Sequence, residues 1–99
     1  MPEGPEIRVA DDPDEHRYEA FVDGALGGFA EYRLRPGRIV FTHTEVDDAY
    51  EGHGVGSTLV RGALDDARAR GLRVTPICPF VRAYIDDHPE YRDLVAPGD

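Results

Sequence analysis

Four residue types are missing from this chain: lysine, asparagine, glutamine and tryptophan. Without lysine, the chain cannot form a phosphate-binding P-loop, which requires one directly after its glycines. Cysteine occurs once, at Cys78, so no disulfide can form within the chain and a reducing intracellular setting is expected. No apolar run approaches the roughly 20 residues that span a bilayer. We therefore expect a cytoplasmic protein with no membrane partner.

Positive charge is also scarce. Twenty acidic residues stand against eleven basic ones, all arginine, which gives a formal net charge of −9. Nucleic-acid binding requires a positively charged surface, so no nucleic-acid partner is expected. The acidic balance favours solubility, and it also permits a cationic partner such as an amine or a basic peptide.

The length of 99 residues fits one domain with a single hydrophobic core. We assign residues 6–95 to this domain, residues 1–5 to a flexible N-terminus and residues 96–99 to a C-terminal tail. The first six residues are acidic and rich in Pro and Gly, and they lack the basic and apolar regions of a signal peptide.

The first half of the chain has the alternating pattern of an antiparallel sheet. Asp23-Gly24 has the preferred chemistry of a two-residue hairpin turn, and Pro36-Gly37 is a second turn signal. A third turn is expected over residues 11–14. The strands are predicted at residues 7–10, 18–22, 29–34 and 39–46.

The second half begins with a helical pattern. Apolar residues recur every three or four positions at Val55, Leu59, Val60, Ala63, Leu64 and Ala67, and Gly71 can end this helix. A fifth strand over residues 72–78 follows a helical crossover, which makes it parallel to the fourth. Pro79 opens a last helix that ends at His88-Pro89. The sequence thus predicts an α+β domain with a mixed sheet of about five strands.

The segment Gly52-His53-Gly54-Val55-Gly56 lies between the fourth strand and the long helix. Alternate glycines allow several backbone N–H groups to face one concavity, and the helix N-terminus adds its own N–H groups and positive dipole. These features suit a diphosphate, whereas the alternative is a turn that binds nothing. A dinucleotide fold is not favoured, because the loop follows a meander and Thr75 stands about where the ribose-binding acid would be.

At these residues the chain resembles the GNAT superfamily of N-acetyltransferases, most closely its very small single-domain branch. The resemblance extends over residues 7–94 and is carried by His43-Thr44-Glu45-Val46, by Glu51-Gly52-His53-Gly54-Val55-Gly56, by Cys78-Pro79-Phe80 and by His88-Pro89-Glu90-Tyr91. It implies the acyl-CoA N-acyltransferase (GNAT-like) fold, with strands four and five splayed at their ends, and acetyl-CoA as cosubstrate.

The same resemblance implies how the cosubstrate is held. The diphosphate would bind the glycine loop, and the pantetheine arm would bind the backbone of the fourth strand. The cofactor-binding residues implied are Thr44, Val46, Glu51, Gly52, His53, Gly54, Val55, Gly56 and Ser57. Glu51 departs from the family pattern, which usually has Arg or Gln there, and a carboxylate beside a diphosphate is expected to weaken binding unless it points away.

Acyl transfer to an amine requires a group that polarises the thioester, a base and an acid. Cys78, expected at the end of the fifth strand, is a candidate nucleophile or positioned thiol, and the alternative is a buried space-filling cysteine. Glu45 and His43 are candidates for a proton relay on one face of the fourth strand, and the alternative is an ordinary surface contact. Tyr84 is a candidate acid or a core residue. The four histidines show no metal-ligand spacing, so no metal is expected.

Three functions therefore remain open. The first is an acetyl-CoA-dependent N-acetyltransferase that acts on a primary amine. The second is a coenzyme A–binding module with little or no turnover, because the resemblance implies that 99 residues leave out the N-terminal helices that wall the acceptor side in larger relatives. The third is a structural domain whose glycine loop is only a turn. A monomer or weak homodimer is expected.

Overall fold

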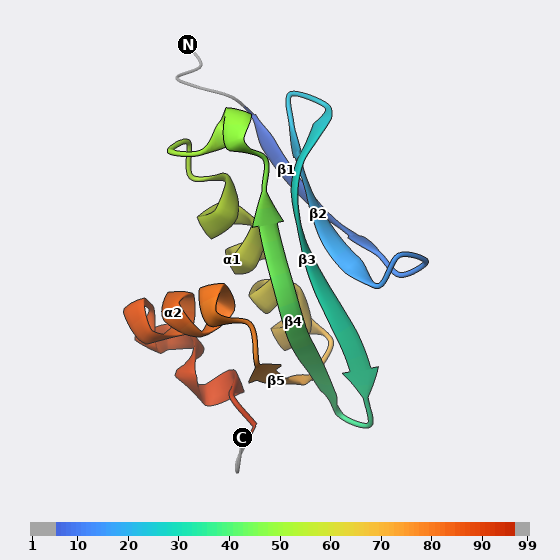
Figure 1. The fold of residues 1–99 in the computed structure, drawn as a ribbon. Coiled ribbons are helices and arrows are strands. Elements are labelled where there is room, and N and C mark those ends of the chain that lie inside the picture. Colours follow the sequence, from blue (N-terminus) through green and yellow to red (C-terminus); the bar gives the residue numbers. More distant parts are fainter. Residues whose placement is uncertain (1–5, 97–99) are drawn as a thin grey trace.

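The computed structural model describes residues 6–96, and the predicted flexible terminus (1–5) and most of the predicted tail (97–99) lie outside the described residues. Its five strands form one sheet in the order β1-β2-β3-β4-β5. The first four pair antiparallel, and β5 pairs parallel to β4 (Figure 1). The strands are β1 (Ile7–Asp12), β2 (Arg17–Val22), β3 (Ala25–Arg35), β4 (Arg38–Val46) and β5 (Arg73–Pro76). The predicted α+β fold with a mixed sheet is confirmed.

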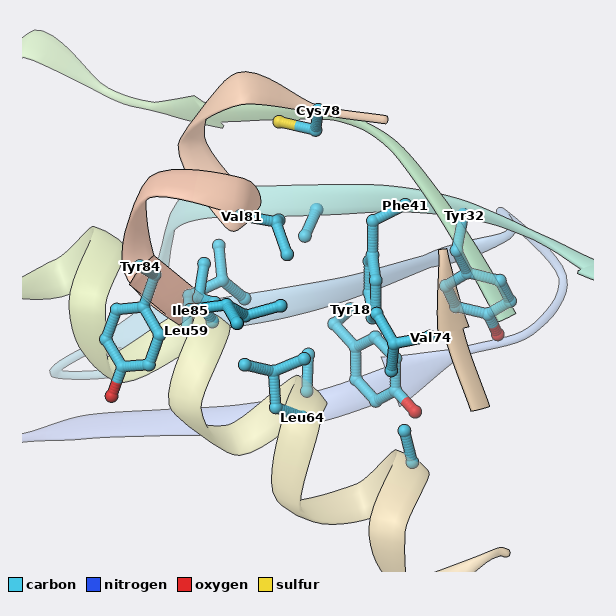
Figure 2. Close-up of a cluster of buried hydrophobic side chains, with 14 of the residues drawn as sticks. Tyr18, Tyr32, Phe41, Leu59, Leu64, Val74, Cys78, Val81, Tyr84 and Ile85 are labelled. Carbon is cyan, nitrogen blue, oxygen red and sulfur yellow. The ribbon is translucent and has the colours of Figure 1, made fainter. Parts of the chain in front are cut away.

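Two α-helices, α1 (Val55–Ala69) and α2 (Pro79–Asp87), pack against the sheet, and two 3₁₀ segments, η1 (Asp48–Tyr50) and η2 (Pro89–Leu94), complete the chain. The buried residues of α1 are the six of the predicted apolar stripe. Side chains from α1, α2 and the sheet form one core, in which Leu59 and Leu64 lie among Tyr18, Phe41 and Ile85 (Figure 2). None of the helices within residues 6–96 is long and apolar enough to cross a membrane.

Several predicted boundaries need correction. β1 continues through Asp12, so the turn lies at residues 13–16 instead of 11–14, and β3 begins directly after the Asp23-Gly24 turn. Both turn residues have positive φ, as a two-residue hairpin turn of this type requires. The predicted fifth strand is shortened at both ends. Leu72 donates its N–H to Ala67 and so closes α1, and at the other end Pro76 has no N–H to extend the ladder.

Candidate functional site

Parallel pairing between β4 and β5 ends early. The register runs from Arg38 opposite Arg73 to Phe41 opposite Pro76. Beyond that point the N–H of Cys78 donates to the carbonyl of Phe41 at 2.9 Å, and then the chain turns into α2. Among the described residues, the edge of β4 from Thr42 to Val46 that faces β5 therefore has no strand partner. Backbone groups on this edge are available to an extended ligand.

A β-bulge at Thr42 determines which side chains of β4 share a face. The neighbours Tyr32 and Glu31 on β3 pair with Phe41 and His43 on β4, which leaves Thr42 as an extra residue. Beyond the bulge, Thr44 pairs with the fully buried Ala30 and faces the helices. His43 and Glu45 alternate with Thr44 and so point to the opposite face.

The bulge brings Thr44 next to Cys78. The thiol is 3 % exposed and donates to Oγ1 of Thr44 at a sulfur–oxygen distance of 3.4 Å. Cys78 does not end β5 as predicted. It is the N-cap residue of α2, because Pro79 begins the helix. The thiol lies at one margin of the core (Figure 2).

His43 and Glu45 form a second pair. Nε2 of His43 lies 2.8 Å from Oε2 of Glu45, and the two side chains are 51 % and 61 % exposed. The imidazole also lies 6.4 Å from the ring of Phe29, which the guanidinium of Arg17 covers on the same face. His43 and Cys78 therefore lie on opposite faces of the sheet.

The glycine loop connects β4 to α1. The carboxylate of Asp47 accepts the N–H of Ala49 and so starts η1. Gly52 and Gly54 then adopt left-handed backbone conformations, with φ of 84° and 76°. Gly54 is the N-cap of α1 and brings no side-chain cap, so the N–H groups of the first turn of α1 remain available at this end.

A cavity of about 440 Å³ opens over these N–H groups, and we call it the glycine-loop cavity. It is lined by Val46, Tyr50, Glu51, Gly52, Gly54, Val55, Gly56, Ser57 and Phe80. Seven predicted cofactor residues are among these, whereas Thr44 and His53 do not line it. The sequence reasoning missed Tyr50 and Phe80. The available signals were an aromatic residue two positions before Gly52 and another directly after Cys78-Pro79.

Tyr84 lies close to this region but belongs to the core. Its ring stacks on His88 at a centroid distance of 3.9 Å, and burial raises the pKa of its phenol. The His88 ring also bonds the carbonyl of Tyr84 through Nδ1, at 2.8 Å. Tyr84 is thus held protonated at neutral pH in a packed position.

Comparisons with known proteins give a family match and several similar proteins. The family profile of GCN5-related N-acetyltransferases matches residues 17–94. Protein NATD1 of Mus musculus is 29% identical over 98% of this chain and 92% of its own length. Streptothricin acetyltransferase of Streptomyces lavendulae is 34% identical over 83% of this chain and 48% of its own.

Solved structures share the fold at low sequence identity. A GCN5-like protein from Staphylococcus aureus superimposes with a TM-score of 0.70 at 22% identity, covering 93% of this chain and 90% of that one. Ribosomal-protein-alanine N-acetyltransferase from Brucella melitensis gives a TM-score of 0.59 at 18% identity, over 98% and 94% of the two chains.

Proposed function

Because the chain belongs to the GCN5-related N-acetyltransferase family, we propose that it transfers the acetyl group of acetyl-CoA to a primary amine. The observation that carries this proposal is the glycine-loop cavity, where two glycines of positive φ and the uncapped start of α1 direct backbone N–H groups to one place. Such donors suit a diphosphate even on an acidic protein, because oriented backbone N–H groups and the helix dipole bind an anion without a basic side chain.

The free edge of β4 supports the rest of the binding mode. A pantetheine arm that leaves the glycine loop along β4 can bond backbone groups between Thr42 and Val46 on the edge that faces β5, where no described strand pairs with β4. Its thioester end then lies near Thr44 and Cys78. On the opposite face of β4, the side chains of His43 and Glu45 are exposed at the same point.

The reaction requires two protons to leave the ammonium of the acceptor. The thioester C–S bond breaks as the amide C–N bond forms, one proton goes to the departing thiolate and one goes to solvent. We assign the second transfer to Glu45, assisted by His43, since this pair is hydrogen-bonded and open to solvent.

We place the Cys78 thiol next to the reacting carbon, where two routes balance. In direct transfer it donates its proton to the departing thiolate and regains one from the ammonium. As an acyl carrier it first takes the acetyl group and releases the coenzyme A thiol, and the amine then takes the acetyl group from the Cys78 thioester and frees the Cys78 thiol.

A turnover assay distinguishes an N-acetyltransferase from a coenzyme A–binding module. The protein is incubated with acetyl-CoA and a panel of primary amines, and free thiol is followed over time. We expect thiol release that depends on both amine and protein. Acetyl-CoA binding, seen as a raised thermal midpoint, without release across the panel would favour the module instead.

Replacement of Cys78 and of Glu45 tests whether each side chain takes part in the reaction. We expect Cys78→Ala and Glu45→Gln each to lower kcat by roughly 100-fold while acetyl-CoA affinity stays within about threefold, since general acid–base groups contribute about that much. Intact mass after acetyl-CoA treatment shows an acetyl adduct if Cys78 carries the acyl group. Unchanged kcat in Cys78→Ala would remove the thiol from the mechanism.

A further inference from the structure

The three glycines of the loop are glycines for different reasons. Gly52 and Gly54 have positive φ, and a Cβ on either would meet nothing within 4 Å. Gly56 lies inside α1 without positive φ, yet a Cβ there would lie 2.6 Å from Cζ of Phe80 and 3.3 Å from Cγ2 of Val46. Backbone conformation therefore explains the first two, and the Phe80 ring explains the third.

Phe80 lines two neighbouring hollows. One is the glycine-loop cavity, and the other is a neighbouring hollow of about 220 Å³ lined by Ser57, Phe80, Ala83, Tyr84, Asp87 and His88. Phe80 is 44% exposed although it is large and apolar. One side of the ring thus rests on Gly56, and the rest remains open to a ligand.

Phe80 also lies on the same helical turn as the candidate thiol. Cys78 and Phe80 are the N-cap and second residue of α2, and Cys78 is fixed to β4 through Phe41 and Thr44. The contact with Gly56 adds a link from this turn to the first turn of α1. The spacing between the glycine loop and the thiol is therefore set in part by how closely Phe80 approaches residue 56.

We propose that Phe80 is a positioning residue for the coenzyme: its ring packs against the apolar arm between diphosphate and thiol, and residue 56 is glycine to admit that ring. The inference rests on the proposed function, because the arm belongs to coenzyme A. It differs from the motif-based interpretation, in which Gly56 serves close approach of the diphosphate.

Binding of two probes tests the role of Phe80. Coenzyme A has the arm, whereas 3′-phospho-ADP has the same nucleotide and diphosphate without it. We expect Phe80→Ala to raise the Kd of coenzyme A about tenfold, because the contact that is lost corresponds to burial of about half a phenyl ring. The Kd of 3′-phospho-ADP should change by less than about twofold. Ile77→Ala is the matched control, since Ile77 is 61% exposed on the same segment and lines neither hollow.

A double variant tests the reason for Gly56. In Gly56→Ala the added methyl displaces the end of an exposed ring, so we expect a stable protein whose coenzyme A Kd rises about tenfold. Phe80→Leu removes the atoms in conflict, and Gly56→Ala combined with Phe80→Leu should bind as Phe80→Leu alone does. Equal weakening of both probes in Gly56→Ala, without recovery in the double variant, would show that Gly56 serves the diphosphate and would overturn the inference.

The two proposals fail in different ways. Wild-type protein that binds neither probe would refute the proposed function together with the role of Phe80. Wild-type protein that binds coenzyme A, with Phe80→Ala unchanged, would refute only the role of Phe80.

Discussion

Thr42 is the residue on which the arrangement of the candidate site depends. Because it is the extra residue of the bulge in β4, Thr44 faces Cys78 while His43 and Glu45 face the other side. Regular pairing would place Phe41, His43 and Glu45 on one face, with two polar side chains directed at the core. The bulge therefore separates a buried thiol from a solvated proton relay, with the free edge of β4 between them.

Glu51 is the residue that opposes the proposed ligand. Glu51 lines the glycine-loop cavity, where a diphosphate would bring further negative charge. We expect Glu51→Gln to lower the Kd of coenzyme A by about three- to tenfold, as removal of a repulsive charge at a partly solvated distance does. Titration calorimetry at low and at high salt measures this effect, which salt should reduce.

A second substitution controls for net charge. Glu15→Gln makes the same change in the turn between β1 and β2, away from the glycine-loop cavity. It should leave the Kd unchanged. Weaker binding in Glu51→Gln would mean instead that Glu51 makes a contact the ligand requires.

The sequence predicted part of the site and missed another part for definable reasons. Alternate glycines before an amphipathic stripe indicate an anion-binding loop, because the chemistry depends on local backbone. The position of Phe80 over Gly56 depends on how two helices pack, and the bulge at Thr42 has no glycine to mark it. Neither follows from local sequence.

At the scale of elements, tyrosine–aspartate hydrogen bonds join α1 to its neighbours. Tyr18 of β2 donates to Asp66 of α1 at 2.5 Å, and Tyr91 of η2 donates to Asp65 at 2.7 Å. Tyr32 of β3 donates to Asp11 of β1 at 2.6 Å. These bonds lie at the rim of the core, and the first two hold α1, which follows the glycine loop, against β2 and η2.

Because of these phenols, we expect the free energy of unfolding to fall at alkaline pH. Burial, together with the neighbouring carboxylates, raises the pKa of Tyr18 and Tyr32 above the ordinary value of 10.0 and raises that of Tyr91 to about 12. Below pH 10 both the folded and unfolded chains keep these protons, so their contribution to stability is complete. Above pH 10 the unfolded chain loses them first, and the free energy of unfolding must fall.

Urea unfolding at pH 7 and pH 10.5 measures this dependence. We expect Tyr18→Phe to cost about 1 kcal/mol at pH 7, because a hydrogen bond is lost, and to reduce the fall at high pH. Tyr50→Phe is the control, since its hydroxyl has no hydrogen-bond partner among residues 6–96. An unchanged pH dependence in Tyr18→Phe would contradict the assignment.

The sequence predicted the order of the helices and strands better than the residues at which they begin and end. The stripe from Val55 to Ala67 and the Asp23-Gly24 turn predicted α1 and the β2–β3 hairpin correctly. The ends of β5 depended on helix capping by Leu72 and on the missing N–H of Pro76, so the predicted strand was too long.

At the scale of the whole molecule, two features concern the choice of acceptor: the net charge and the face of the sheet opposite the helices. The chain carries a net charge of −9. No helix lies between β1 and β2 in the described chain, since a short turn joins them. Aromatic rings on the face opposite the helices are covered by arginines, as Phe21 is by Arg8 and Phe29 by Arg17. These arginines give the face local positive charge, so only the net charge of the molecule supports the cationic amine of the proposed function.

Backbone amide shifts during a titration with coenzyme A test the central claim most directly. A ¹⁵N-labelled sample reports each N–H separately, so it locates the diphosphate as well as detecting binding. The largest shifts are expected at Gly54, Val55, Gly56 and Ser57, with smaller ones along β4 from Thr42 to Val46. No shifts at millimolar coenzyme A, or shifts confined to other parts of the sheet, would contradict the account.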